Sequence, residues 1–146
     1  MTLGRQLTHL GGARVTIGVP LLVAVLGGAE RRIGLAMLLA NAASHLAVQI
    51  LKRLVQRPRP CDAAGHPLAL VPLRDPFSFP SGHSAAATAL AVTLALTYGW
   101  LAVPALLLAA GVATTRVSLR VHHVGDVLAG VCLGVAGAIL GYSVFV

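Results

Sequence analysis

The chain has 146 residues, of which 57% are hydrophobic and only 10% are charged, and its formal net charge at pH 7 is +7. Soluble domains carry about 25% charged residues, so this composition, with a mean hydropathy of +0.86, excludes an ordinary soluble enzyme. The length predicts a single domain over residues 1–146. A basic excess can indicate nucleic-acid binding, but here the basic residues lie at the ends of apolar segments. We therefore expect the lipid bilayer, and no nucleic acid, as a partner.

Five apolar stretches predict an all-α integral membrane bundle of about five transmembrane helices. Each is close to the ~20 residues that span a bilayer, at residues 15–29, 33–51, 82–98, 100–115 and 125–146. The first follows a charged stretch, as in a signal peptide, but no persuasive cleavage site follows it, so we expect a retained helix. Residues 1–14 are mixed in polarity and predict a short interfacial segment.

The long connection at residues 52–81 contains six of the eight prolines and cannot be a span. Pro58 and Pro60 end the preceding helix. Alternating crossings place this connection on the same face of the membrane as the N-terminus and the stretch 116–125. We call this the basic face, because it receives nine of the eleven basic residues, whereas the opposite face receives Arg31 and Arg32. The nine are Arg5, Arg14, Lys52, Arg53, Arg57, Arg59, Arg74, Arg116 and Arg120.

The carboxylates and cysteines exclude several chemistries. The chain has four acidic residues, which are scattered over different connections and cannot converge on two divalent metals. We therefore expect catalysis without a metal and no cofactor. Cys61 lies in the long connection and Cys132 in a predicted span, so neither a disulfide nor a CxxC metal site is expected.

Three sequence blocks meet on the basic face, at residues 52–60, 80–83 and 116–126. Lysine and arginine side chains suit phosphate oxygens. Ser81 and Gly82 open a predicted helix, where free backbone N–H groups and the positive end of the helix dipole favour an anion. Gly82 also lets the backbone approach a ligand closely. The blocks predict an anion cradle.

The same blocks contain a candidate nucleophile and a candidate acid. His122 and Asp126 are four residues apart and share a helical face. A carboxylate on one imidazole nitrogen fixes the tautomer and leaves the other nitrogen free to attack. His83 could protonate the leaving oxygen. His123 competes with His122, since it also lies close to Asp126 in sequence. Together these groups suit a phosphomonoesterase or a pyrophosphatase.

The three blocks resemble the signature of the type-2 phosphatidic acid phosphatase superfamily, which also includes vanadium haloperoxidases and bacterial acid phosphatases. The family pattern is lysine, six residues, Arg-Pro; then Pro-Ser-Gly-His; then Ser-Arg, five residues, histidine, three residues, aspartate. Thr115 stands where serine is usual and keeps the hydroxyl. The matching residues are Lys52, Arg59 and Pro60; residues 80–83; and Arg116, His122 and Asp126.

The resemblance implies a role for each matching residue. His122, favoured over His123 by the motif spacing, would be the nucleophile that forms a phosphohistidine, and Asp126 would orient it. His83 would be the general acid that later activates water. The phosphoryl oxygens would be held by Lys52, Arg59, Arg116, Ser81 and the Gly82 backbone. The family works without a metal.

Other polar residues near these blocks are candidates for supporting roles. Asn41 and Gln49 lie on one stripe of the second span with Lys52, and intramembrane polar groups usually face a bundle interior. They could support Lys52 or could instead hydrogen-bond between helices. Arg120, one turn after Arg116, is a further candidate. The pair Gly130 and Gly134 predicts a close helix contact.

The resemblance also suggests a substrate and a location. We expect an amphiphile whose phosphate lies at headgroup level and whose tails lie between the helices. A polyprenyl phosphate or diphosphate is favoured by analogy, with phosphatidylglycerol phosphate, phosphatidic acid and a lipid phosphotransferase reaction as alternatives. A haloperoxidase, which has a large soluble scaffold, and a non-catalytic lipid-binding protein are less consistent with these residues. The protein is expected in the plasma (inner) membrane. The charge distribution favours a cytoplasmic site, and the family analogy an extracytoplasmic one.

Overall fold

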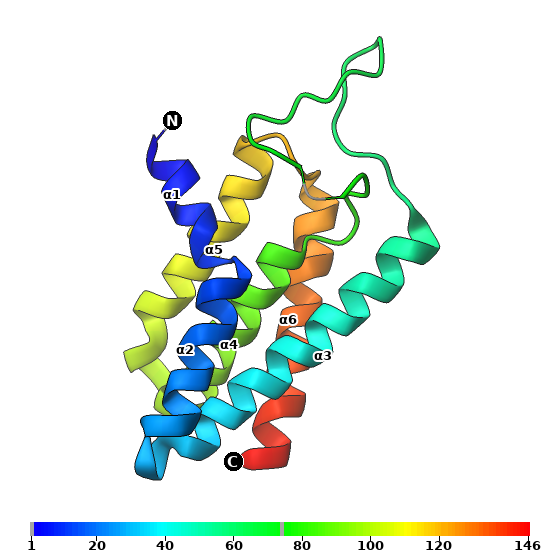
Figure 1. Cartoon of the computed structure of the whole chain (residues 1–146). Helices are drawn as coiled ribbons and strands as arrows, with labels where there is room; N and C mark the ends of the chain where they lie inside the picture. The colour runs from blue at the N-terminus through cyan, green and yellow to red at the C-terminus, as the bar shows by residue number, and fades with distance from the viewer. Residues whose placement is uncertain (1, 74) are drawn as a thin grey trace.

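The computed structural model describes residues 2–73 and 75–146, with the side chains of residues 2–5 excepted, so Arg74 and the Arg5 side chain lie outside the described part. Its regular secondary structure is helical (Figure 1). The described residues form no strand, only isolated bridges between Pro58 and Phe77 and between Cys61 and Pro67. The prediction of an all-α fold is confirmed. The α-helices are α1 (Thr2–Leu10), α2 (Ala13–Leu26), α3 (Arg31–Val55), α4 (Gly82–Tyr98), α5 (Val103–Ser118) and α6 (Val124–Phe145), and the 3-10 helices are η1 (Gly28–Glu30) and η2 (Gly99–Ala102).

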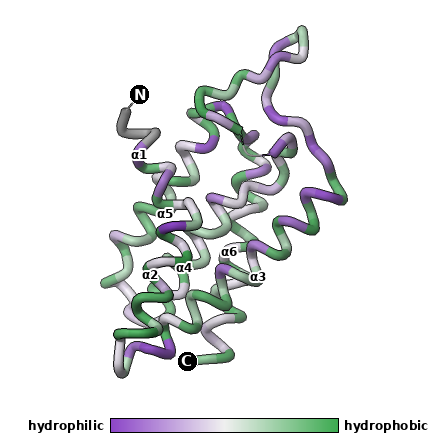
Figure 2. Tube along the Cα trace, viewed as in Figure 1, coloured by the Kyte–Doolittle hydropathy of each residue, from purple (hydrophilic) through white to green (hydrophobic). Residues whose placement is uncertain are grey.

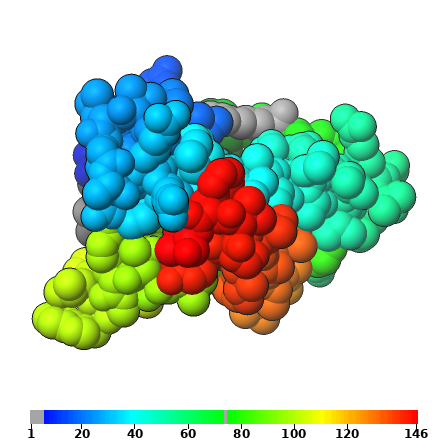
Figure 3. Space-filling view, turned by 90° about the horizontal axis from the view of Figure 1, so that it is seen from below, coloured from blue at the N-terminus to red at the C-terminus, as the bar shows by residue number. Residues whose placement is uncertain are grey.

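From α2 to α6, successive helices run up and down the bundle, and α1 runs in the same direction as α2 (Figure 1). In Figure 1, α1, the connection between α3 and α4, and the turn between α5 and α6 lie at one end, and η1, η2 and the C-terminus lie at the other. The first end is the basic face predicted from the sequence. Hydrophilic residues are more frequent towards that end, and apolar residues cover the helices (Figure 2). Seen from the opposite face, the end of α6 lies between the α2–α3 corner and the α4–α5 corner (Figure 3).

Three stretches are long and apolar enough to cross a membrane: Gly28–Val55, Gly82–Ser118 and Val124–Phe145. The second stretch contains two helices, α4 and α5, which pack together and reverse direction through η2. Gly99 begins this reversal with a φ of +59°, a conformation that glycine adopts easily. With its 14 residues, α2 rises only about 21 Å, less than the ~30 Å hydrocarbon core. The five predicted segments correspond to α2–α6, and the protein is a multi-pass membrane protein.

Residues 2–12, which fall in the predicted interfacial segment, pack against the bundle. Helix α1 lies against α5, and the Thr8 side chain is buried. The chain leaves the helical path at Gly11 and Gly12 before α2 begins. A Cβ atom on Gly11 would lie 2.8 Å from Val112 Cγ1 and 3.0 Å from the His83 carbonyl oxygen. The start of the chain is therefore packed beside the start of α4.

Small residues let the helices approach closely. A Cβ atom on Gly130 would lie 2.4 Å from the Ser81 carbonyl oxygen, and one on Gly134 would lie 2.5 Å from the Ala85 carbonyl oxygen. This confirms the close contact predicted for these glycines, a kind of packing that is common in membrane bundles. Two further glycines of α6 contact α3 in the same way, Gly137 and Gly141. Large apolar side chains instead face outward, as with Leu22 and Leu107, which are 58% and 67% exposed.

We predict that Gly130→Ala destabilises the bundle by about 1–3 kcal/mol, because the new methyl group has no space against Ser81. The gain in helix propensity, about 1 kcal/mol, offsets only part of this loss. Equilibrium unfolding of the purified protein in detergent measures the change. Gly111→Ala is the matched control: nothing lies within 4 Å of its added Cβ, so its stability should be unchanged or higher. Equal stability of the two variants would contradict the packing argument.

Candidate active site

The start of α4 is tied to the start of α6. Ser81 is the N-cap of α4: its hydroxyl accepts from the Ser84 backbone N–H at 3.5 Å and lies 2.9 Å from the Ser84 hydroxyl. Its own backbone N–H donates to the Asp126 carbonyl at 2.9 Å. Ser81 is fully buried. Gly82 and His83 follow in the first turn and are partly exposed, at the helix end whose free N–H groups favour anions.

His122 is held by a backbone carbonyl. The residue is buried, and its Nδ1 lies 2.6 Å from the Ser78 carbonyl oxygen. A carbonyl only accepts hydrogen bonds, so Nδ1 carries the proton and Nε2 of the neutral ring has a free lone pair. The Asp126 carboxylate lies 3.8 Å from Nδ1, beyond hydrogen-bond distance. The group that fixes the tautomer is therefore Ser78, and Asp126 lies next to the ring.

Asp126 is fully buried and has other partners. Its Oδ1 accepts from Arg57 Nη1 at 2.9 Å. Its Oδ2 accepts from the His123 backbone N–H at 2.8 Å and lies 3.2 Å from His123 Nδ1. The carboxylate thus caps α6, and its burial is compensated by a cation and an N–H donor. Arg57 is more than a charge at the membrane surface, because it holds Asp126.

Lys52 and Arg59 converge on one carboxylate. The Lys52 ammonium donates to Asp75 Oδ1 and to the Phe77 carbonyl, both at 2.9 Å. Arg59 donates from Nη2 to Asp75 Oδ1 at 3.2 Å and from Nε to the Asp75 carbonyl at 2.9 Å. A third bond runs from Arg59 Nη1 to the Val121 carbonyl at 2.7 Å. Since Val121 precedes His122, this bond places Arg59 beside the candidate nucleophile.

Arg116 is the third cation of the cluster. It is buried in the last turn of α5, and its Nη1 donates to the hydroxyl of the buried Thr8 in α1. The N-terminal helix therefore supplies a hydrogen-bond acceptor to Arg116, a predicted phosphate-binding residue. The positive charge of Arg116 lowers the pKa of His122. The residues of the site therefore come from α1, α3, α5 and the connections beside them.

His122 lies in the connection between α5 and α6, and the nearby cations lower its pKa. Burial, followed by the positive charges of Arg116 and Arg59, lowers the pKa of His122 from 6.5 to about 3, with a smaller effect of Lys52. The hydrogen bond to Ser78 opposes this shift. The imidazole is therefore neutral at pH 7, which is the form that can act as a nucleophile.

The candidates for supporting roles lie elsewhere. Asn41 Nδ2 donates to the Thr16 carbonyl at 3.0 Å and so ties α3 to α2, about 16 Å along the helix from Lys52. Gln49 Nε2 lies 3.2 Å from His45 Nε2 on an exposed surface. Arg120 is exposed in the turn after α5, with a φ of +55°. Asn41 thus takes the interhelical role, the alternative left open above.

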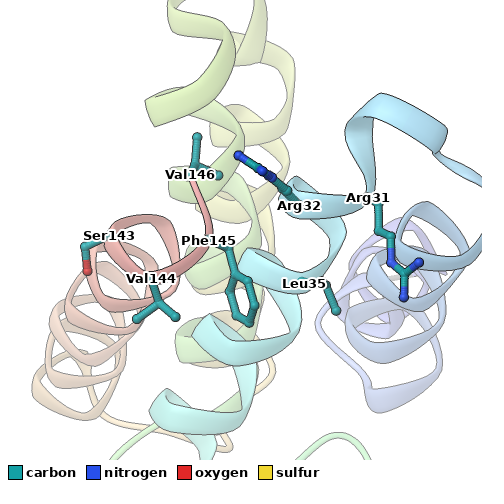
Figure 4. A pocket seen from close by; sticks show the side chains of 7 residues that line it. All are labelled: Arg31, Arg32, Leu35, Ser143, Val144, Phe145 and Val146. Atoms are coloured by element: carbon teal, nitrogen blue, oxygen red, sulfur yellow. The ribbon is translucent and has the colours of Figure 1, made fainter.

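Neither the potential metal ligands nor a hollow at the opposite end of the bundle competes with this site. Across residues 2–73 and 75–146, no three or more His, Cys, Asp and Glu side chains are grouped closely enough to hold a metal ion. A hollow of about 620 Å³ lies at the opposite end of the bundle, between the start of α3 and the end of α6 (Figure 4). Its lining residues are Arg31, Arg32, Leu35 and residues 143–146. The cluster around His122 therefore remains the candidate active site.

Comparison with known proteins identifies the family. The profile of the PAP2 superfamily matches residues 33–146, the part of the chain that carries all three motif blocks. The chain belongs to the PAP2 superfamily. The resemblance noted from the motifs is thereby confirmed.

Curated relatives of this PAP2 protein are lipid phosphatases by name. The chain is similar to the decaprenylphosphoryl-5-phosphoribose phosphatase of Mycolicibacterium smegmatis, with 37% identity over 134 residues, or 89% of this chain and 71% of that protein. It is also similar to the protein of the same name from Mycobacterium tuberculosis, with 38% identity over 100 residues, or 66% of this chain and 53% of that protein. The second match thus covers about half of the mycobacterial protein.

Two solved PAP2-like structures share the fold. The transmembrane PAP2-type phosphatidylglycerolphosphate phosphatase from Bacillus subtilis has a TM-score of 0.79 and 30% identity, covering 98% of this chain and 75% of that one. LpxE from Aquifex aeolicus has a TM-score of 0.81 and 23% identity, covering 97% and 84%, a likeness of fold. The family match, the curated relatives and the Bacillus subtilis structure confirm the predicted class of the protein, a membrane-bound hydrolase of lipid phosphate esters.

Among the residues that contact the PAP2 motif residues, several were not predicted as site residues, including Thr8, Arg57, Asp75 and Ser78. The Ser78 carbonyl binds His122, Arg57 binds Asp126, Asp75 binds Lys52 and Arg59, and Thr8 binds Arg116. Arg57, Asp75 and Ser78 all lie in the connection between α3 and α4, so their place on the basic face was the available signal. Thr8 gave none, because only the packing of α1 on α5 brings it to the site.

We predict that His122 stays neutral well below pH 6. Its folded pKa of about 3 lies below its ordinary value of 6.5, so between these values the unfolded chain binds a proton that the folded protein does not. The His122 contribution to stability is therefore full above pH 6.5 and is lost as the pH falls towards 3. Imidazole ¹⁵N shifts of the protein in detergent, assigned with His122→Gln, should be constant from pH 8 to pH 5. A titration midpoint near 6.5 would show that the cations do not act on the ring.

Proposed function

We propose that the protein releases phosphate from a phosphomonoester or pyrophosphate headgroup of a membrane lipid, through a phosphohistidine on His122 and without a metal or cofactor. The observation that carries this proposal is the setting of the His122 ring. Its Nδ1 donates a hydrogen bond to the Ser78 carbonyl, which leaves Nε2 as the reactive nitrogen. The positive charges of Arg116, Arg59 and Lys52 lower the pKa of the ring and keep it neutral.

In the first step, Nε2 of His122 attacks the phosphorus atom and the bond from phosphorus to the leaving oxygen breaks. The equatorial oxygens carry the charge of the transition state. Lys52, Arg59 and Arg116, with the N–H groups at Gly82, stabilise that charge. His83 donates a proton to the leaving oxygen, so the lipid product leaves as an alcohol or, from a pyrophosphate, as a monophosphate.

In the second step, water replaces the histidine. His83, now neutral, takes a proton from the water, whose oxygen attacks the phosphorus atom as the bond to Nε2 breaks. Inorganic phosphate forms and both histidines return to their starting states. Between the steps, the phosphorylated ring gains positive character, and the Asp126 carboxylate 3.8 Å from Nδ1 stabilises it. Asp126 thereby acts on the intermediate, while Ser78 fixes the tautomer of the resting state.

The substrate we favour is a polyprenyl-phosphate lipid. The support is that two relatives with 37% and 38% identity are named for decaprenylphosphoryl-5-phosphoribose, a polyprenyl lipid that bears a phosphate on its sugar. Phosphatidylglycerol phosphate is the second candidate, since the Bacillus subtilis neighbour with 30% identity is a phosphatase of that lipid. Both place a phosphate monoester at headgroup level.

Phosphate release by the purified protein tests this function. We expect release from polyprenyl-phosphate lipids with and without a chelator, and a loss of roughly a thousandfold or more in His122→Ala, because the nucleophile is removed. A radiolabelled phosphate should be trapped on the wild-type protein as an acid-labile adduct. His123→Gln is the control, since this neighbour also lies near Asp126 but is not the nucleophile. Full activity of His122→Ala would refute the mechanism.

We further propose that the site faces the cytoplasm, in the plasma (inner) membrane. After Lys52, Arg57, Arg59 and Arg116 are set aside as functional, five basic residues remain on the basic face against two on the other. Lys and Arg accumulate on the cytoplasmic side of membrane proteins. Cys61 is exposed in the long connection and provides a native label in a Cys132→Ala background. A membrane-impermeant maleimide should label it only after cells are opened; labelling in intact cells would place the site outside.

A further inference from the structure

In the described part of the chain, the Asp75 carboxylate contacts two of the cations proposed to bind phosphate. Its Oδ1 lies 2.9 Å from Lys52 Nζ and 3.2 Å from Arg59 Nη2. We propose that Asp75 is a positioning residue that lowers the net positive charge around the phosphate-binding cations. It holds Lys52 and Arg59 in place. It also weakens the binding of inorganic phosphate, so that the product leaves. This inference rests on the proposed function.

The carboxylate orients both cations without using all of their donors. An ammonium has three N–H donors and a guanidinium has five. The bonds of Lys52 to Asp75 and Phe77 use two of its three. The bonds of Arg59 to Asp75 and Val121 use three of its five. One donor of Lys52 and two of Arg59 therefore remain for phosphoryl oxygens while both side chains are anchored.

The charges of the cluster show what Asp75 changes. Lys52, Arg59 and Arg116 give +3, the His122 ring is neutral, and Arg57 and Asp126 cancel as an ion pair. With Asp75 the sum over these groups is +2; the proton that His83 carries as the proposed acid adds the same charge with or without Asp75. Without it the sum would be +3, and three like charges in a largely buried site would both repel one another and bind a released phosphate dianion more tightly.

Asp75 lies on the solvent side of the cations and is itself held. Its side chain is 40% exposed, whereas those of Lys52 and Arg59 are 9% and 8% exposed. The Phe77 backbone N–H donates to Oδ1 at 3.1 Å, which fixes the carboxylate in a local turn. These contacts keep the pKa of Asp75 low: burial raises it, but the bond to Lys52 and the charges of Lys52 and Arg59 outweigh burial. The carboxylate is therefore ionised beside the cations.

Three residues downstream, the same segment holds the candidate nucleophile, because the Ser78 carbonyl binds His122. Ser78 is anchored in turn, since its backbone N–H donates to the Arg57 carbonyl at 2.8 Å and its hydroxyl donates to the Pro58 carbonyl at 2.9 Å. Residues 75–78 thus connect the cations to the ring. A change of charge at Asp75 acts on phosphate binding directly, whereas loss of its oxygen would also disturb the anchoring of Lys52 and Arg59.

The variant Asp75→Asn separates charge from anchoring, because an amide keeps the acceptor oxygen and the size of the side chain. The dissociation constant of inorganic phosphate, measured by calorimetry on the purified protein in detergent, should fall by about tenfold or more, as expected when a unit charge is removed a few ångströms from a dianion. The inhibition constant of inorganic phosphate, measured as a product inhibitor of lipid phosphate hydrolysis, should fall by the same factor. Asp75→Ser, which loses the anchoring oxygen as well as the charge, should bind phosphate more tightly than the wild type but less tightly than Asp75→Asn.

Asp62→Asn is the matched control. Asp62 lies in the same connection and accepts hydrogen bonds from the Ala64 and His66 backbone N–H groups, so its removal should leave phosphate affinity unchanged. Wild-type or weaker phosphate affinity in the folded Asp75 variants would overturn the inference. The binding measurement needs no turnover. A wild-type protein that binds phosphate but hydrolyses no lipid phosphate would refute the proposed function alone, whereas hydrolysis without tighter binding in the variants would refute only the role of Asp75.

Discussion

The hydrogen bond from His122 to the Ser78 carbonyl joins residues that are 44 positions apart in the chain, and the rest of the site is arranged around it. Ser78 is fixed on the backbone of Arg57 and Pro58, and Arg57 in turn binds Asp126, four residues after His122. The first and third motif blocks are therefore joined through Ser78, which lies two residues before the second block. Because a carbonyl can accept but not donate, this arrangement allows only one tautomer of the ring.

Collecting three cations around a neutral ring is costly unless each has an acceptor. The acceptors come from outside the motif positions: the Asp75 carboxylate, the Phe77 and Val121 carbonyls, and the Thr8 hydroxyl. The long connection between α3 and α4 and the N-terminal helix are thus part of the site. Their role is to keep the cations in position before a substrate arrives, so that little reorganisation is needed at the moment of reaction.

The sequence predicted the helices well, for physical reasons, and several of its candidate site residues lie close together in the structure. Apolar length identifies α3 to α6 because a bilayer demands it, and the prolines at 58 and 60 mark the end of α3. Only 10% of the residues are charged, and burying a charge in a membrane protein is costly. Lys52, Arg59 and Arg116 were therefore candidates for a functional role. Spacing along the chain cannot reveal tertiary packing. It therefore does not show which carbonyl accepts the hydrogen bond of His122 Nδ1, or which arginine pairs with Asp126. The expected pair of His122 and Asp126 is close in space, but its atoms have nearer partners.

The glycines of α6 have a consequence for how a lipid reaches the enzyme. A Cβ on Gly137 would lie 2.5 Å from the Ala40 carbonyl oxygen, and one on Gly130 would lie 2.4 Å from that of Ser81, so no hydrocarbon tail fits between α6 and its neighbours α3 and α4. A lipid whose headgroup enters the cluster of cations would therefore keep its tail outside these two helix interfaces.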